Sequence, residues 1–320
     1  MSLNISKSTL QRWAPVLVLL VLCLILTTIN SNFFSVRNFA RIATASAAPL
    51  MVAIGVTFII LMGSIDLSME GIVAFSGAML AITISYLGGF ESWGWLAVPI
   101  ALLIGAVLGL INGLLHVMLR IPSFLASLGM GFTCIGLTMF LTDGNRIQAK
   151  DTVFRMLLTE RFWGFPLMVY AALAALVGAW FIQNHTSLGR HFYAIGGGEE
   201  LAHASGVKVN RVRVLGFALA GVFFAAGAIF AVARIGSVAS NLGDGYMFIA
   251  ITSVVVGGTA LTGGVGGVWQ SLIGVLIVNV INNGMVLVGF PTYIQQGVLG
   301  LMVILAVALA TNRHLTQLVK

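Results

Sequence analysis

The sequence predicts an all-α, polytopic membrane protein with about ten transmembrane helices in one domain, residues 1–320. Charged residues make up 8% of the chain and hydrophobic residues 59%, with a mean hydropathy of +1.06. A soluble domain carries about 25% charged residues. The apolar runs are continuous, as from Val16 to Ile29, whereas the strands of a transmembrane β-barrel alternate polar and apolar residues. A soluble enzyme, a disordered chain and a nucleic-acid-binding protein are therefore excluded.

Ten apolar runs approach the length of about 20 residues that a membrane-spanning helix needs. The first follows Lys7 and Arg12 and is longer than the apolar core of a signal peptide, about 7–15 residues, so it is interpreted as an uncleaved span. Backbone groups inside a bilayer must bond to one another, so the runs are expected to be helices, some of them broken. They cover residues 13–29, 47–64, 70–88, 94–118, 122–142, 165–183, 212–234, 246–262, 268–288 and 294–311.

Two long loops, 143–164 and 184–213, interrupt this series. With ten spans and a cytoplasmic N-terminus, both termini are predicted to be cytoplasmic, and the second loop faces the cytoplasm. Nine Lys and Arg residues then lie inside and seven outside, the bias that the positive-inside rule favours. The nine are Lys7, Arg12, Arg120, Arg190, Lys208, Arg211, Arg213, Arg313 and Lys320.

The chain carries a faint internal repeat. Leu103-Ile104-Gly105 recurs as Leu272-Ile273-Gly274, and Ile111-Asn112 as Ile281-Asn282. Short apolar motifs also recur by chance, so the repeat is a hypothesis. If it is real, each half has five helices, and an odd number makes the halves inverted, as in many transporters.

No catalytic group, metal site or cofactor site is predicted on this chain. None of the five histidines has zinc-type spacing with Cys or a carboxylate, and no Gly-x4-Gly-Lys-Ser/Thr phosphate loop is present. Cys23 and Cys134 both fall inside apolar runs, where a cysteine is typically a small core residue.

The polar groups inside the apolar runs are mostly neutral. They either bond hydroxyl groups along a conduit or tie helix to helix, the latter worth about 0.6 kcal/mol each. These groups are Thr57, Asn112, Thr133, Thr252, Ser253, Asn279, Asn282, Asn283, Gln295 and Gln296.

Asp66 is the exception, because it interrupts two apolar runs with no room for a loop. One interpretation is a short turn in which Asp66 caps the helix that starts near Ser68. The other is a broken segment that lines the conduit, and both can hold together.

Small residues recur every four positions at Ala101, Gly105, Gly109 and Gly113. This spacing predicts one flat helix face on which a second helix packs closely. The second helix belongs either to this subunit or to a second copy of it.

The 184–213 loop predicts a short helix from Glu199 to Ser205, closed by Gly206. Its two N-terminal acids, Glu199 and Glu200, suit the helix dipole. A short helix flanked by basic residues is interpreted as a docking element, and the alternative is a plain interfacial loop.

From about Asn32 to Ala310 the chain resembles the membrane subunit of ribose-type sugar importers of the ATP-binding-cassette class. The resemblance is carried by motifs that occur in the family's order. They are Asn32-Phe33-Phe34-Ser35-Val36-Arg37-Asn38, Ile65-Asp66-Leu67-Ser68, Ser123-Phe124-Leu125-Ala126-Ser127-Leu128-Gly129, Thr142-Asp143-Gly144-Asn145, Thr186-Ser187-Leu188-Gly189-Arg190, Ala194-Ile195-Gly196-Gly197, Ser205-Gly206-Val207, Val256-Gly257-Gly258-Thr259-Ala260-Leu261 and Asn282-Asn283-Gly284.

The resemblance implies a pore-forming permease subunit in the bacterial inner membrane. It implies a second permease chain, identical or related, ATPase subunits that hold the ATP and Mg²⁺, and a periplasmic sugar-binding protein. The residues implied in ATPase coupling are Arg190, Gly197, Glu199, Glu200, Leu201, Ala202, Ser205 and Gly206. From the polar groups inside the apolar runs and the family's motifs together, the residues predicted for the translocation path are Asp66, Asn112, Phe124, Thr259, Asn282, Asn283 and Gln296.

The chain departs from the family's pattern at three places. Acidic residues usually follow Gly245-Tyr246, where this chain has Met247-Phe248-Ile249. The usual Val-Gly after Ser68 is Met69-Glu70-Gly71, and the usual Asn after the glycine pair is Gly198. Two alternatives stay open: an ion-coupled carrier that acts alone, and a permease of the same class for amino acids or nucleosides.

Overall fold

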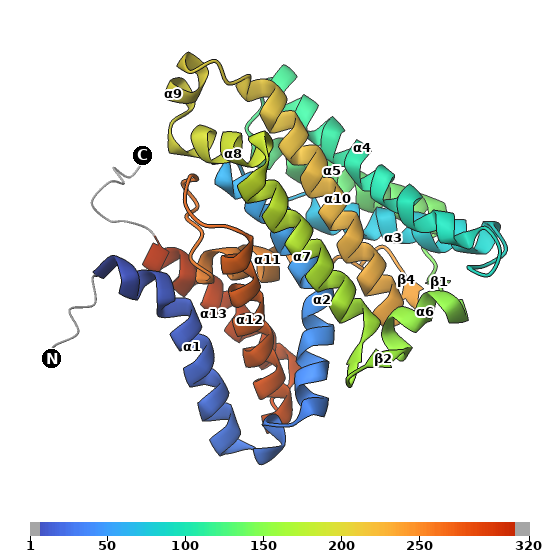
Figure 1. Cartoon of the computed structure of the whole chain (residues 1–320). Helices are drawn as coiled ribbons and strands as arrows, with labels where there is room; N and C mark the ends of the chain where they lie inside the picture. The colour runs from blue at the N-terminus through green and yellow to red at the C-terminus, as the bar shows by residue number, and fades with distance from the viewer. Residues whose placement is uncertain (1–6, 311–320) are drawn as a thin grey trace, which may run out of the picture.

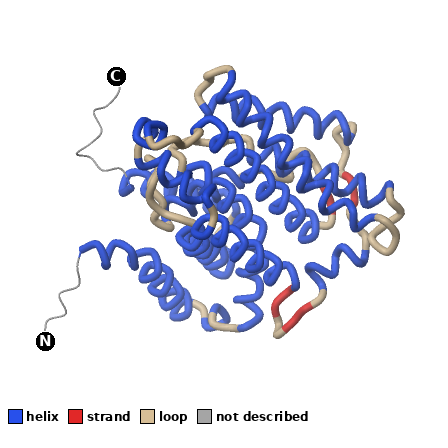
Figure 2. The backbone as a smooth tube through the Cα atoms, turned by 45° about the horizontal axis from the view of Figure 1, so that its top comes forward, coloured by secondary structure: helices blue, strands red, loops and turns tan. Residues whose placement is uncertain are grey.

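The structure, a computed structural model, describes residues 7–310, and these form thirteen α-helices (Figure 1). The strands of this part of the chain are four, each of two residues, and loops and turns join the helices (Figure 2). Arg313 and Lys320, which enter the orientation prediction, lie outside the described residues. The helices are α1 (Lys7–Ile29), α2 (Val36–Leu61), α3 (Met69–Tyr86), α4 (Ala97–Met118), α5 (Ser123–Thr142), α6 (Thr152–Thr159), α7 (Leu167–His185), α8 (Ser187–Gly197), α9 (Glu199–Ala204), α10 (Val209–Ile235), α11 (Tyr246–Val256), α12 (Val268–Val288) and α13 (Thr292–Ala310).

The membrane-spanning character is confirmed. Within residues 7–310, seven helices are long and apolar enough to cross a membrane: α2, α3, α4 with the preceding 3-10 turn η2 (Gly94–Leu96), α5, α7, α10 and α12. Three shorter apolar helices, in α1, α11 and α13, correspond to the remaining predicted runs.

Two predicted runs differ from the observed helices. α2 begins at Val36 rather than at residue 47, because the side chain of Ser35 caps it by accepting a hydrogen bond from the Asn38 N–H (3.3 Å). The predicted run 246–262 is wrong in its second half, because α11 stops at Val256. Six glycines follow within residues 257–267, several at positive φ, and they form a loop in place of a helix.

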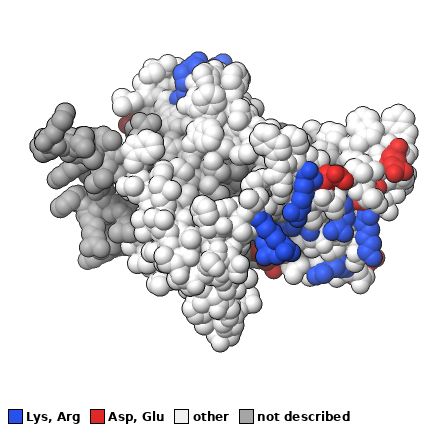
Figure 3. Space-filling model, turned by 60° about the horizontal axis from the view of Figure 1, so that its bottom comes forward, with Lys and Arg blue, Asp and Glu red and all other residues white. Residues whose placement is uncertain are grey.

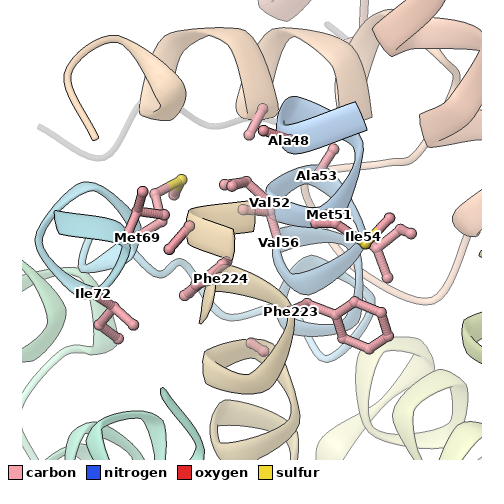
Figure 4. Close-up of a cluster of buried hydrophobic side chains, with 14 of the residues drawn as sticks. Ala48, Met51, Val52, Ala53, Ile54, Val56, Met69, Ile72, Phe223 and Phe224 are labelled. Carbon is pink, nitrogen blue, oxygen red and sulfur yellow. The ribbon is translucent and has the colours of Figure 1, made fainter. Parts of the chain in front are cut away.

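The two longest helices, α2 and α10, form the centre of the protein. Residues 46–62 are buried without exception, as expected of a helix that is apolar on every side. α2 packs against α7, α10, α11 and α12, and α10 packs against α3 and α4. Figure 4 shows side chains of α2, α3 and α10, among them Val52, Met69 and Phe224, gathered in one cluster.

The predicted small-residue face lies on α4 and packs against α10 of the same chain. A methyl group added at Gly105 would overlap the backbone of Gly221, and one at Gly109 would overlap the backbone of Phe217. The small-residue face therefore packs against a helix of its own subunit and not against a second copy, which is the first of the two predicted alternatives.

The helices of the two halves exchange contacts. α3 packs on α10, and α11 packs on α2; α4 packs on α10, and α12 packs on α2. Within each half, α3 contacts α4 and α5 as α11 contacts α12 and α13. Contacts in the first half are thus matched by contacts in the second, and the five-plus-five repeat itself stays a prediction.

The long loop 143–164 folds against the end of the bundle that lies opposite α9 (Figure 1). Its β1 (Ile147–Gln148) pairs antiparallel with β4 (Ser237–Val238), with Ile147 opposite Val238. β2 (Arg161–Phe162) pairs with β3 (Phe165–Pro166). These two ribbons and α6 close this end of the protein.

Candidate functional site

The predicted short helix is α9, and the structure adds a second helix that was not predicted, α8, directly before it at one end of the bundle (Figure 1). The two helices together are the docking element. The Thr186 side chain caps α8 by accepting a hydrogen bond from the Gly189 N–H (3.3 Å). α9 covers Glu199–Ala204, within one residue of the predicted helix. Gly206 follows at φ +86°, a conformation that glycine adopts without strain.

Seven of the eight predicted coupling residues lie on the surface of this element. Leu201 is the most prominent, because 74% of this large apolar side chain is exposed. A hollow of about 810 Å³ beside α9 is lined by Gly198, Glu199, Glu200, Leu201 and His203. The hollow therefore has both an apolar side chain and two acidic side chains at its edge.

Ala202 is the exception among the eight. It is 5% exposed and faces the interior of its own chain, so the prediction that it lets a partner approach is wrong. The Glu199 carboxylate also serves the fold, since it accepts hydrogen bonds from Nη1 (2.8 Å) and Nη2 (2.5 Å) of Arg213 on α10. This ion pair fixes α9 to α10.

A polar cluster lies inside the protein at the start of α3. Asp66 is 2% exposed, and its Oδ1 accepts hydrogen bonds from Ser68 N–H (2.8 Å), the Ser68 hydroxyl (2.5 Å) and Asn112 Nδ2 (3.4 Å). Burial raises the pKa of the Asp66 carboxyl to about 6, although these hydrogen bonds favour the ionised form. Asp66 therefore shapes the short turn before α3 and contacts a second helix. It does not cap the helix as predicted, because Ser68 is the N-cap residue and makes no side-chain cap hydrogen bond.

The segment 62–68 is a non-helical stretch between two apolar helices. α5 satisfies part of its backbone, because the hydroxyls of Ser123 and Ser127 accept hydrogen bonds from the N–H groups of Ile65 (3.0 Å) and Leu67 (2.9 Å). Phe124, in the same turn of α5, is 44% exposed. Asp66, Asn112 and the first turns of α5 are thus brought to one place.

The other predicted path residues are not part of this cluster. Asn283 on α12 exchanges two hydrogen bonds of 3.0 Å with Asn38 on α2, so it ties helix to helix. Thr259 is buried in the loop 257–267, where its hydroxyl accepts a hydrogen bond from Gly267 N–H (3.2 Å). Asn282 is partly buried on α12, and Gln296 is exposed on α13. The seven residues do not line one continuous surface.

Three residues that sequence reasoning did not assign make long-range bonds near these sites. The Tyr193 hydroxyl on α8 donates to the Gly266 carbonyl (2.7 Å) and accepts a hydrogen bond from Gln183 Nε2 (2.9 Å). Glu70 Oε1 accepts hydrogen bonds from the N–H groups of Gly245 (2.9 Å) and Met247 (3.2 Å). Two of them carry a feature that the sequence shows. Gln183 is a polar residue in an apolar run, and Glu70 is an acid that departs from the family pattern.

Arginines gather at the end opposite α9, where Figure 3 shows Lys and Arg side chains close together. A hollow of about 250 Å³ is lined by Arg37, Arg41, Arg161 and Arg234. No carboxylate side chain belongs to this lining, so the hollow is strongly basic.

Comparison with known proteins gives a consistent result. The family described as "branched-chain amino acid transport system / permease component" matches residues 38–307. The ribose import permease protein of Escherichia coli K12 is 34% identical over 97% of this chain and 96% of its own length. That of Bacillus subtilis is 38% identical over 94% and 92%, and a galactose/methyl galactoside import permease protein of Haemophilus influenzae is 34% identical over 97% of each. No solved structure matches the chain.

Proposed function

The chain belongs to the family of permease components of branched-chain amino acid transport systems, and we propose that it is the membrane subunit of an ATP-driven importer of a monosaccharide. The observation that carries the proposal is near full-length similarity to import permeases for ribose and for galactose or methyl galactoside. The reaction is transport, and the chain supplies a path and a mechanical link. ATP and Mg²⁺ are bound by the ATPase subunit.

The α8–α9 element is the surface to which the ATPase docks, in the cytoplasm. Its exposed Leu201 fits a groove of the partner as an apolar anchor, and Glu200 and Arg190 lie on the same exposed element. Both termini are then cytoplasmic, in a bacterial inner membrane. The opposite end, with its arginines, faces the periplasm and receives the sugar-binding protein.

The path itself is proposed to run past neutral polar groups. Neutral amides and hydroxyls bond sugar hydroxyls without holding an ion, and Asn112 and Ser68 supply such groups beside Asp66. A second permease chain, identical or related, completes the path.

Docking is tested by copurification of the ATPase with tagged permease. Leu201→Ala removes the apolar side chain that is proposed to fill a groove of the ATPase, and losses of about 2 kcal/mol or more arise where a side chain is fully buried in such a pocket. Gly206→Val forces a side chain into a left-handed backbone conformation. We expect both variants to insert into the membrane, to lose most of the copurified ATPase and to lose sugar uptake.

Trp93→Ala is the matched control, because Trp93 is a 63% exposed apolar residue on the loop before η2. It should keep the full complement of ATPase. If Leu201→Ala and Gly206→Val also keep it and take up sugar normally, the 184–213 segment is only a linker. The coupling role then moves to the turn at residues 65–71.

An amino acid is the second candidate substrate, because the description of the matching family names branched-chain amino acids. Uptake of radiolabelled ribose, galactose and leucine by cells that lack their own carriers separates the two. Uptake of either sugar supports the proposal, and uptake of leucine alone contradicts it.

A further inference from the structure

A hydroxyl group on the docking element is hydrogen-bonded to a loop in the protein interior. Tyr193 lies on α8, six residues before Glu199 begins α9. Its hydroxyl donates to the Gly266 carbonyl (2.7 Å) in the loop 257–267. Burial raises the pKa of the Tyr193 phenol, so the group stays protonated and able to donate. Any displacement of α8 therefore acts directly on this loop.

Gln183 extends the same connection to α12. Its Nε2 donates to the Tyr193 hydroxyl (2.9 Å), and its Oε1 accepts a hydrogen bond from Val268 N–H (2.8 Å), the first residue of α12. α12 has no side-chain cap of its own, so Gln183 satisfies one of the N–H groups that a helix leaves unpaired at its start. Gln183 is 6% exposed, and both polar atoms of its amide, Nε2 and Oε1, are hydrogen-bonded.

The loop is also pressed against α8 and the end of α2. A methyl group at Gly196 would overlap the Leu61 carbonyl and come within 2.4–3.0 Å of Gly263 and Gly264. Gly264 N–H donates to the Leu61 carbonyl (3.0 Å). Residue 61 is followed by the segment that carries Asp66. The loop 257–267 thus lies between the docking element on one side and the start of α12 and the end of α2 on the other.

We propose that Tyr193 is the positioning residue that couples movement of the docking element to the loop 257–267 and to the start of α12. The proposal rests on the proposed function of the α8–α9 element. A helix moves as a rigid body, and six glycines allow the loop to change its backbone angles. Without a bond between them, the loop would absorb the movement of α8 instead of passing it to α12.

The test is Tyr193→Phe in the complete importer, reconstituted in vesicles with its copurified ATPase and binding protein. The variant keeps the ring and removes both hydrogen bonds. We expect a full complement of ATPase, continued ATP hydrolysis and an at least fivefold fall in sugar moved per ATP, with radiolabelled ribose and galactose as probes. A residue that only stabilises the fold would change the amount of active protein and leave this ratio unchanged.

Tyr170→Phe is the matched control, because the Tyr170 hydroxyl also donates to a backbone carbonyl, that of Phe162 (2.7 Å), at the opposite end. It should leave the ratio as in the wild type. A wild-type ratio in Tyr193→Phe overturns the proposal, and so does loss of the ATPase on purification, because the hydroxyl would then belong to the docking surface.

A distance measurement covers the case in which Tyr193→Phe inserts poorly. Spin labels at Ser187→Cys on α8 and Trp269→Cys on α12, both exposed positions outside the predicted coupling residues, report whether the two elements move together. With Cys23 and Cys134 replaced, we expect the distance between the labels to stay constant on ATP binding while the transporter changes state. A distance that changes in the otherwise wild-type chain overturns the proposal.

Failure of the Tyr193 proposal and failure of the proposed function give different results. A wild-type complex that imports neither sugar with ATP contradicts the proposed function. A wild-type complex that imports sugar, while Tyr193→Phe is equally well coupled, contradicts the role of Tyr193 alone.

Discussion

Glu70 shows how one residue joins the two halves of the chain. The first turn of α11 contains no acid, although a negative charge there would favour the helix dipole. Glu70, in the first turn of α3, supplies that charge through its bonds to Gly245 and Met247. The two departures from the family pattern, an acid gained at residue 70 and acids missing after Tyr246, are therefore related in space.

We expect Glu70→Ala to lower the free energy of unfolding by about 1–3 kcal/mol, because two N–H groups at the start of α11 lose their acceptor. Glu70→Gln keeps an acceptor oxygen and loses only the charge, so it should cost less. Thermal unfolding of the purified permease in detergent measures both. Glu91→Ala, at an exposed acid, is the control and should have little effect. Equal midpoints for Glu70→Ala and wild type would show that the bonds to α11 contribute nothing.

At the scale of the helix, close packing replaces the hydrophobic effect as the force between neighbours. Lipid is as apolar as the side chains that it would replace, so contact between backbones stabilises a helix pair in a membrane. α4 and α10 reach that contact because Gly105 and Gly109 face Gly221 and the backbone of Phe217. This pair holds the Asn112 side chain beside Asp66.

We expect Gly109→Val to destabilise the protein by about 1–3 kcal/mol or more, because its side chain overlaps the backbone of Phe217. Gly178→Val on α7 introduces the same side chain where nothing lies within 4 Å. The yield of monodisperse protein and its unfolding midpoint should fall for the first variant only. If both variants behave alike, the loss is caused by valine in the membrane and not by the α4–α10 contact.

The whole molecule has two ends of different character. One carries the α8–α9 element with its exposed Leu201, and the other carries the basic hollow beneath the short strand ribbons. Like charges close together repel one another, so arginines that line one hollow without a carboxylate cost stability. That cost is offset when an acidic surface docks on them. The arginine end therefore suits a partner with surface carboxylates.

We expect Arg37→Glu combined with Arg41→Glu to raise about tenfold the concentration of binding protein that gives half-maximal uptake, since charge pairs at an interface steer association. In the wild type this concentration should rise with salt, because exposed charges are screened. Lys150→Glu changes an exposed cation outside the hollow lining and is the control. If the wild type, the double variant and Lys150→Glu all need the same concentration of binding protein for half-maximal uptake, the binding protein does not dock at this hollow.

The sequence alone determined the class of this protein, the number and places of most apolar helices, and the short helix that precedes Gly206. These features depend on composition and on neighbours a few residues apart, so hydropathy, spacing and turn residues record them directly. The glycine face of α4 belongs here too, because a four-residue period predicts close packing, although it does not name the partner helix.

Only the tertiary structure decided how distant residues meet. Tyr193 lies 73 residues from Gly266, and Glu70 lies 175 residues from Gly245; such pairs leave no local period in the sequence. The same holds for Asn283, which could face a conduit or a neighbouring helix until its bond to Asn38 was seen. Ala202 was assigned to a partner because small residues permit close approach, but which molecule approaches depends on the face that the fold turns inward.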